Sequence, residues 1–162
     1  MSLKISHAAG DALAAALKTA LDGGILYLFA GPVPATAGEA LDMGADHTEV
    51  VKITESDDGS TGLTFEAAVD GLLAKEGDED WLGTAAFDGA EDGEANLSPT
   101  FYRFCTAADN GRGLANETTG HRIQGTVGGP SSGADLVLQS GSVANSAEVP
   151  IGAFSVRIGP AD

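Results

Sequence analysis

The residues of this 162-residue chain that could do chemistry are three histidines, a single cysteine and a glycine-rich stretch. His7, His47 and His121 each stand alone, because none has a second His or Cys at metal-ligand spacing such as H-x-x-x-H or C-x-x-C. Cys105 lies in the run TFYRFCTA, which is typical of a small buried residue rather than of an activated thiol. We therefore expect ordinary surface or turn histidines and a buried cysteine.

The glycine-rich stretch Gly125–Gly133 (GTVGGPSSG) invites comparison with phosphate-binding loops. It lacks the Lys-Ser/Thr that ends a Walker loop, and Pro130 removes one of the amide donors that a phosphate cradle uses. Ser131 and Ser132 lack the G-x-S-x-G context of a nucleophile elbow. The stretch thus predicts a turn between two strands.

Acidic residues are densest from Glu76 to Glu94, on both sides of the apolar patch Trp81–Phe87. Three interpretations stay open: a solvated loop, a Ca²⁺ site, or an electrostatic contact with a basic partner. The D-x-[DN]-x-[DN]-G spacing of a calcium loop is absent.

With 24 Asp and Glu in the chain, paired carboxylates are expected by chance and do not indicate a glycosidase. We predict no catalytic residue, metal ligand or cofactor, and hence that the protein is not an enzyme.

Phe101, Tyr102, Arg103 and Phe104 place three large rings and a cation within four residues. Both faces of such a strand are bulky, which predicts a central strand with Arg103 near a sheet edge or a subunit boundary. A platform for a partner or a carbohydrate is the alternative interpretation.

One helix, at about residues 6–22, must precede these elements. Leu13, Leu17 and Leu21 recur at helical spacing on an alanine-rich background, Ser6 is a suitable N-cap, and Gly23-Gly24 ends the helix.

After the helix, the spacing of apolar residues changes from the helical pattern to that of β-strands, in which every second residue lies on the same face. Residues 25–30 (ILYLFA) predict a buried strand, residues 31–47 a long loop, and alternation in residues 122–127 and 153–158 an antiparallel sheet with one face on a core. Further strands are expected at residues 49–54, 63–68, 72–75, 84–87, 100–106 and 135–139. We predict a single all-β domain over residues 1–162. It has an N-terminal helix (residues 1–24) and an antiparallel β-sandwich or barrel-like part (residues 25–162), with an acidic insertion at about residues 76–98.

The formal net charge of −16 excludes a nucleic-acid binder, and it argues against docking on an anionic membrane. Residues 1–94 hold 19 acidic residues and four lysines, whereas residues 95–162 hold five acidic residues and four arginines. The charge is therefore polarised along the chain, which predicts two different faces.

The sequence contains no run of 18 apolar residues, so no membrane span is predicted. Its one cysteine cannot form an internal disulfide, which fits folding in a cytoplasm.

The order of these elements resembles the small virion structural proteins of tailed bacteriophages and prophages. The segments that carry the resemblance are LYLFAGPVPATA, HTEVVKI and RIQGTVGGPSSGADLVLQ, and the acidic stretch departs from the pattern. The matching residues are Gly31, Pro34, Ala35, Gly125, Val127, Gly128, Ser132, Gly133, Ala134, Asp135 and Leu136. The resemblance implies a β-rich structural module, and it transfers no catalytic residue.

The resemblance implies a capsid decoration (cement) protein that binds and stabilises the major capsid protein lattice. Such a protein would be made in the bacterial host cytoplasm, would lie on the capsid surface of the virion, and would form a trimer or another cyclic homo-oligomer. Residues expected to contact a partner or another copy are Leu13, Leu17, Leu21, Arg103, Arg122 and Arg157. The alternatives are a phage tail or head–tail neck component, or a carbohydrate-binding β-sandwich module.

Overall fold

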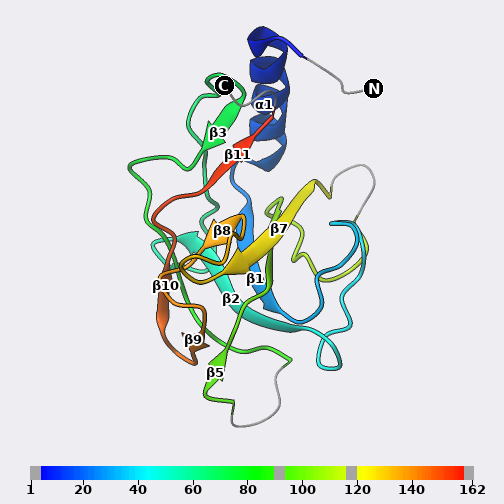
Figure 1. Ribbon diagram of the computed structural model, residues 1–162, viewed down its shortest axis with the longest axis vertical. Helices are drawn as coiled ribbons and strands as arrows, with labels where there is room; N and C mark the ends of the chain where they lie inside the picture. Colours follow the sequence, from blue (N-terminus) through cyan, green and yellow to red (C-terminus); the bar gives the residue numbers. More distant parts are fainter. Residues whose placement is uncertain (1–4, 90–93, 116–119, 159–162) are drawn as a thin grey trace.

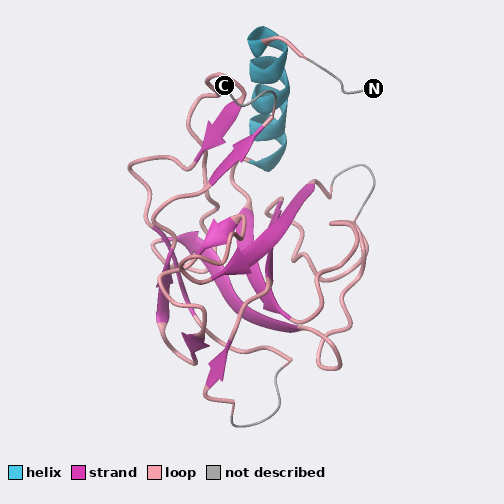
Figure 2. Ribbon diagram, viewed as in Figure 1, coloured by secondary structure: helices cyan, strands magenta, loops and turns pink. Residues whose placement is uncertain are grey.

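The computed structural model describes residues 5–89, 94–115 and 120–158 (Figure 1). Helix α1 (His7–Leu21) is followed by short strands joined by long loops (Figure 2). The strands are β1 (Ile25–Ala30), β2 (Thr48–Glu55), β3 (Leu72–Ala74), β4 (Trp81–Thr84), β5 (Asn96–Leu97), β6 (Phe101–Cys105), β7 (Arg122–Gly128), β8 (Leu136–Val137), β9 (Val143–Ala144), β10 (Glu148–Pro150) and β11 (Ser155–Arg157). The expected all-β fold with one N-terminal helix is confirmed.

Seven strands form one curled sheet in the order β10-β4-β2-β1-β6-β7-β8. All neighbours are antiparallel except β7 and β8, which pair in parallel through Val127↔Leu136 and Gly128↔Val137. The sheet is therefore mixed, and the prediction of a purely antiparallel sheet is wrong at this edge. A single tight turn would make this pair antiparallel, whereas residues 129–135 form a longer loop that returns the chain beside β7 in the same direction; Ser131 and Gly133 in this loop have positive φ angles (67° and 71°).

The β1 strand is buried on both faces, as its continuous apolar run predicts. Leu26 and Leu28 contribute to the main core, whereas Ile25, Tyr27 and Phe29 contribute to a smaller cluster on the opposite face. The strand pairs with β2 and with β6, so that Leu26 lies between Ile53 and Phe104. The seven-stranded sheet thus has two covered faces. We call the face that carries Ile25, Tyr27 and Phe29 the second face, and it holds the candidate site.

Helix α1 lies beside a separate two-stranded sheet made of β3 and β11, at one end of the molecule (Figure 1). Its N-cap is Ser6, whose hydroxyl oxygen accepts a hydrogen bond from Ala9 N (3.3 Å). The leucine stripe does not share one environment: Leu21 is fully buried, Leu17 is half-buried and Leu13 is 50% exposed. No helix within the described residues is long and apolar enough to cross a bilayer.

The acidic stretch is part of the main sheet. Strand β4 lies between β2 and β10, and Trp81 at its start is 1% exposed among the aromatic rings of the main core. The stretch was expected to form an insertion, but its apolar patch supplies a strand that begins at Trp81 instead of Thr84. Residues 90–93, which belong to the same expected insertion, lie outside the described residues.

Other strand predictions differ in detail. Residues 63–68 form only isolated bridges, such as Gly24↔Leu63 and Phe65↔Lys75, while the short strands β5, β9 and β10 were not expected. Strands from the acidic first part (β1, β2, β4) lie between strands from the near-neutral second part. The charge polarity along the chain is thus not a division into two separate lobes.

Candidate functional site

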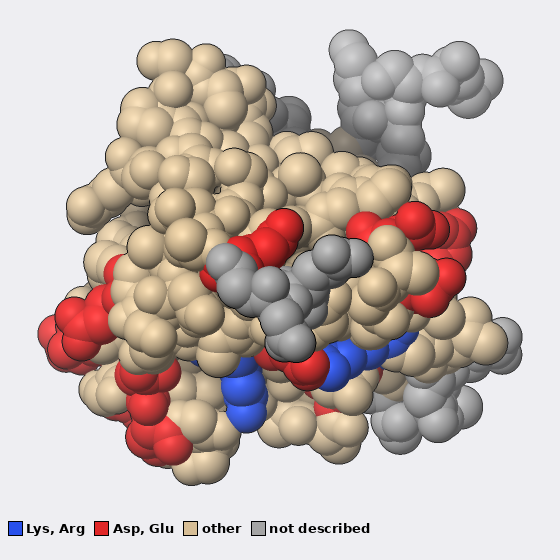
Figure 3. Space-filling model, turned by 90° about the horizontal axis from the view of Figure 1, so that it is seen from below, with Lys and Arg blue, Asp and Glu red and all other residues tan. Residues whose placement is uncertain are grey.

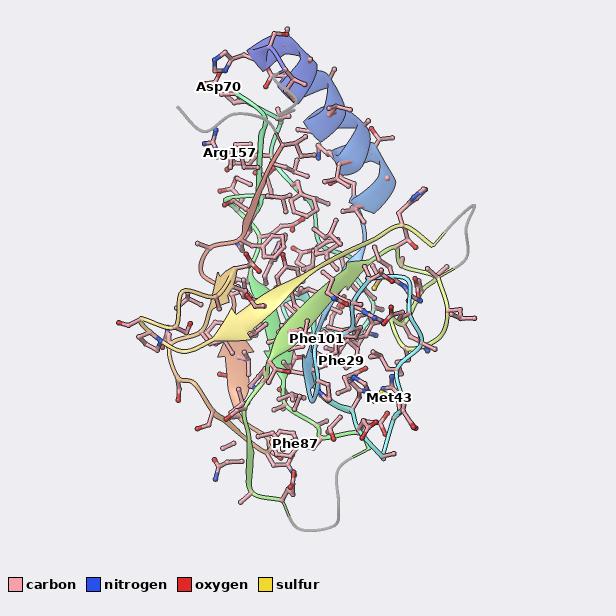
Figure 4. All side chains as sticks on the ribbon, turned by 45° about the vertical axis from the view of Figure 1, so that its right-hand side comes forward. Phe29, Met43, Asp70, Phe87, Phe101 and Arg157 are labelled. Carbon is pink, nitrogen blue, oxygen red and sulfur yellow. The ribbon has the colours of Figure 1, made fainter. Side chains whose placement is uncertain are left out.

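The second face of the sheet carries a network of buried polar contacts above an apolar floor. Its apolar floor consists of Ile25, Tyr27, Phe29, Phe101 and Cys105. Two loops, residues 31–47 and 106–115, cover this floor, and we call them together the loop layer. Figure 4 shows Phe29 and Phe101 close together on the sheet, with Met43 on the covering loop. The rings of Phe29 and Phe101 stack with their centroids 5.2 Å apart.

Arg103 is the centre of this layer. Its Nε donates to Gln124 Oε1 (3.0 Å), and its Nη1 donates to the carbonyl oxygens of Glu39 (2.8 Å) and Gly111 (2.5 Å). Its Nη2 donates to the Thr36 carbonyl oxygen (3.3 Å), and its guanidinium lies 5.9 Å from the Phe101 ring centroid. Burial lowers the pKa of Arg103 from its usual value.

The prediction that Arg103 lies near a sheet edge is wrong. Strand β6 lies between β1 and β7, and the Arg103 side chain is 0% exposed. The central position of the strand was expected from its three rings. The buried cation is tolerated because four acceptors from loops and from β7 surround it, an arrangement that only the folded chain creates.

Arg122 joins the loop layer to the edge of β7. Its Nε and Nη2 form a two-pronged pair with Asp109 Oδ2 (2.5 Å) and Oδ1 (2.6 Å), and its Nη1 donates to the carbonyl oxygens of Ala37 and Gly113. Burial by itself would raise the pKa of Asp109. The hydrogen bonds from Arg122 and from Gly111 N outweigh burial, so the pKa of Asp109 is lowered.

A second ion pair holds the loop layer against β2. Arg112 donates from Nε (3.0 Å) and Nη2 (2.8 Å) to Glu49 Oε2, and its Nη2 also lies 2.6 Å from Asp88 Oδ2. Glu49 is 8% exposed, and burial raises its pKa even though Arg112 opposes the shift.

Two further contacts fix the start of the long loop. Gln124 Nε2 donates to the Pro34 carbonyl oxygen (2.9 Å), and His47 Nε2 lies 2.9 Å from the Pro32 carbonyl oxygen. The His47 ring also meets the Phe101 ring edge-on, with centroids 5.8 Å apart. His47 is therefore a turn histidine with a structural role.

Cys105 lies under this layer and is 0% exposed, which confirms the expected buried thiol. Gly111 covers it, with φ of +72°, so closely that an added Cβ would lie 3.1 Å from the Cys105 sulfur. Burial raises the pKa of Cys105 to about 12. The Cys105 thiol is therefore protonated at neutral pH.

A shallow hollow of about 340 Å³ adjoins the layer and is lined by Asp109, Asn110, Leu114 and Arg122, among others. Leu114 is 78% exposed at its rim. Among the described residues that line the hollow, the charged groups are Asp109 and Arg122, and they pair with each other.

Carboxylates spread over the underside of the molecule, with a few basic side chains between them (Figure 3). Among the described residues, no group of three His, Cys, Asp or Glu side chains is arranged to hold a metal ion. Some carboxylates have local structural roles: Glu79 accepts from Trp81 Nε1 (2.8 Å), and Asp58 accepts from the Thr61 hydroxyl, Ser60 N and Thr61 N. The bond from the Thr61 hydroxyl and those from the two backbone amides lower the pKa of Asp58 to about 2.

The six expected contact residues do not form one surface. Leu13 and Arg157 are exposed on the lobe of α1, β3 and β11, where Arg157 Nη1 donates to the Asp70 carbonyl oxygen (3.3 Å). Leu21 lies in the main core, and the side chains of Arg103 and Arg122 bond within the chain. Sequence reasoning missed Arg112, Glu49 and Gln124, for which the only local signal was the Asn110-Gly111 turn beside Arg112.

Comparison of the chain with protein-family models, with curated proteins and with solved structures finds no match. In this arrangement the buried polar groups hydrogen-bond to one another and to loop carbonyls.

Proposed function

We propose that this protein is a virion structural protein that decorates a capsid, binding and stabilising the major capsid protein lattice as a homo-oligomer. The sequence resemblance to small virion proteins of tailed bacteriophages and prophages motivates the proposal. The structural observation that carries it is the outward face of α1.

After its first residue, His7, whose Nδ1 lies 3.7 Å from Asp70 Oδ1, the outward face of α1 carries no Asp, Glu, Lys or Arg. Its exposed residues there are small: Ala8, Ala12, Ala15, Ala16 and Thr19, with the half-exposed Leu13 beside them. A helix whose outer face is exposed to solvent normally has charged or polar residues on that face. In a chain with a net charge of −16, an uncharged helix face is well suited to burial against another protein surface.

The charged residues of α1 are used on the inward side instead. Asp11 Oδ1 accepts from Gly71 N (2.7 Å), and Asp22 Oδ1 accepts from Phe65 N (3.0 Å). Lys18 Nζ pairs with Asp22 (2.6 Å) and donates to the Phe65 carbonyl oxygen. These bonds hold the helix to the rest of the chain and leave the alanines facing outwards, where small side chains allow a close approach of a second helix.

The acidic surface supports a second kind of contact. Carboxylates that are not used in the folded chain would pair with a basic patch on the capsid lattice, and this attraction would weaken as salt screens it. We therefore expect decoration to combine an apolar contact through α1 with a salt-dependent contact elsewhere.

The test is the copy number of the protein in native virions, measured by quantitative mass spectrometry. Decoration requires hundreds of copies per particle; a few copies would refute it and would favour a tail or neck component. Cross-linking in intact virions then identifies the neighbour, which decoration requires to be the major capsid protein.

A pair of variants tests the role of α1. Leu13→Glu places a charge on the helix face, whereas Val137→Glu is a matched control on β8, since Leu13 is 50% and Val137 is 53% exposed. We expect Leu13→Glu to abolish self-association and capsid binding with an unchanged circular dichroism spectrum, and Val137→Glu to leave both intact. Equal behaviour of the two variants would exclude α1 as the contact.

A further inference from the structure

The loop layer is held to the sheet mainly by polar bonds. In the apolar cluster that it covers, only Leu41 and Met43 come from the layer itself. The main core on the other face contains 20 buried residues, including Trp81 and the three phenylalanines whose rings contact it. Segments with few buried apolar contacts open at a lower free energy than the core of the same protein.

The two loops of the layer are tied to each other. Leu41 N donates to the Arg112 carbonyl oxygen (2.7 Å), and Ala115 N donates to the Gly38 carbonyl oxygen (3.0 Å). The two buried arginines add further links, because each donates to carbonyl oxygens of both loops. Neither loop can leave the sheet without breaking bonds of the other, which favours a joint movement.

The long loop leaves and re-enters the sheet at a single narrow point. Gly31 has φ of +124°, and an added Cβ there would overlap the Asp46 carbonyl oxygen. Gly44 has φ of +83°, and its N donates to the His47 carbonyl oxygen (2.9 Å). This closed neck is typical of an Ω-loop, which can swing away while β1 and β2 stay paired.

Hydration of the arginines favours the open form. In the closed form the Arg103 side chain is 0% exposed and that of Arg122 is 2% exposed. On opening, both guanidinium groups and the loop carbonyls regain water, which offsets part of the lost hydrogen bonding. An apolar layer of the same size would have no such compensation.

We propose that the loop layer opens as one unit and uncovers Tyr27, Phe29, Phe101 and Cys105, while the seven-stranded sheet and the main core stay folded. The layer is thus a hinged cover over an aromatic strip, and the opening is a property of the folded protein.

Cys105 reports the opening directly, because it is the only cysteine of the chain. The full-length native protein is incubated with 5,5′-dithiobis(2-nitrobenzoate) at increasing urea, and Trp81 fluorescence measures global unfolding in parallel. We expect labelling at low urea to depend only weakly on urea, with an opening equilibrium at least about tenfold more favourable than global unfolding. Labelling with the same urea dependence and the same equilibrium constant as global unfolding would overturn the proposal.

Variants locate the hinged unit. Gln124→Ala removes the bond to the Pro34 carbonyl oxygen and the acceptor of Arg103 Nε, and we expect Cys105 labelling to accelerate about fivefold to tenfold. Arg157→Lys, on the distant lobe, is the control and should leave labelling unchanged. Equal labelling of the wild type and Gln124→Ala, with both folded, would refute a role for the layer.

Hydrogen exchange of the wild type provides a measurement that needs no variant. The amides of Leu41 and Ala115, which bond across the two loops, should exchange through one common opening, and before those of β1. Different opening free energies at these two amides would refute a joint movement.

Discussion

Arg103→Leu is the substitution that tests the architecture of the second face most severely. Leucine removes the guanidinium group and keeps part of the side-chain volume. The change leaves four acceptors without their donor: the carbonyl oxygens of Thr36, Glu39 and Gly111, and Gln124 Oε1. The loops above β6 then lose the group that joins them to the sheet.

The size of the effect follows from these four bonds. A hydrogen bond to a charged group contributes about 1.5–3 kcal/mol, so four of them set an upper bound of about 6–12 kcal/mol. Two effects reduce this figure: the buried cation no longer has to lose its hydration, and water reaches the loop carbonyls once the side chain is gone. We expect a net loss of about 3–5 kcal/mol in the free energy of unfolding, as for other broken buried charge networks.

The assay is urea unfolding followed by the fluorescence of Trp81, the only tryptophan, which is 1% exposed. With a slope of about 2 kcal/mol per M, the expected loss lowers the urea midpoint by about 1.5–2.5 M. Arg157→Leu is the matched control, because Arg157 is exposed and makes one long hydrogen bond; it should change stability by less than about 0.5 kcal/mol. A loss below about 1 kcal/mol for Arg103→Leu would refute the view that this guanidinium holds the loop layer.

Three further predictions concern the sheet, the helix and the pH dependence. Gly83→Ala should destabilise the protein by about 1–3 kcal/mol in urea unfolding, because its Cβ would overlap the Lys52 carbonyl oxygen; a neutral result would contradict this packing. Ser6→Ala should cost about 1 kcal/mol by removing the N-cap, seen as a lower thermal midpoint by circular dichroism, whereas Ser6→Asp should retain the stability. The pKa of Asp109 is lowered in the folded state, so its stabilising effect is complete above the ordinary pKa of about 4 and is lost as pH falls through the lowered value. The stability difference between the wild type and Asp109→Asn should therefore be constant near pH 7 and shrink below about pH 4; a difference that grows in acid would reverse the assigned sign.

Local features of this protein follow from its sequence because they depend on neighbouring residues. Ser6 caps α1, Gly23 with φ of +75° follows its end, and the run from Ile25 to Ala30 forms a strand buried on both faces. The expected burial of Cys105 follows in the same way, from the large rings beside it. A helix cap, a left-handed glycine and an apolar run need little more than the chain within a few residues.

Pairings between distant segments were decided only in the tertiary structure. Arg103 is a charged residue in a strand pattern, and nothing near it in sequence shows that Thr36, Glu39 and Gly111 will supply its acceptors. Trp81 begins a central strand within an acidic stretch because β2 and β10 pair with it on either side. A residue's charge fixes which partners it needs, whereas the fold decides whether loops, a second strand or water provide them.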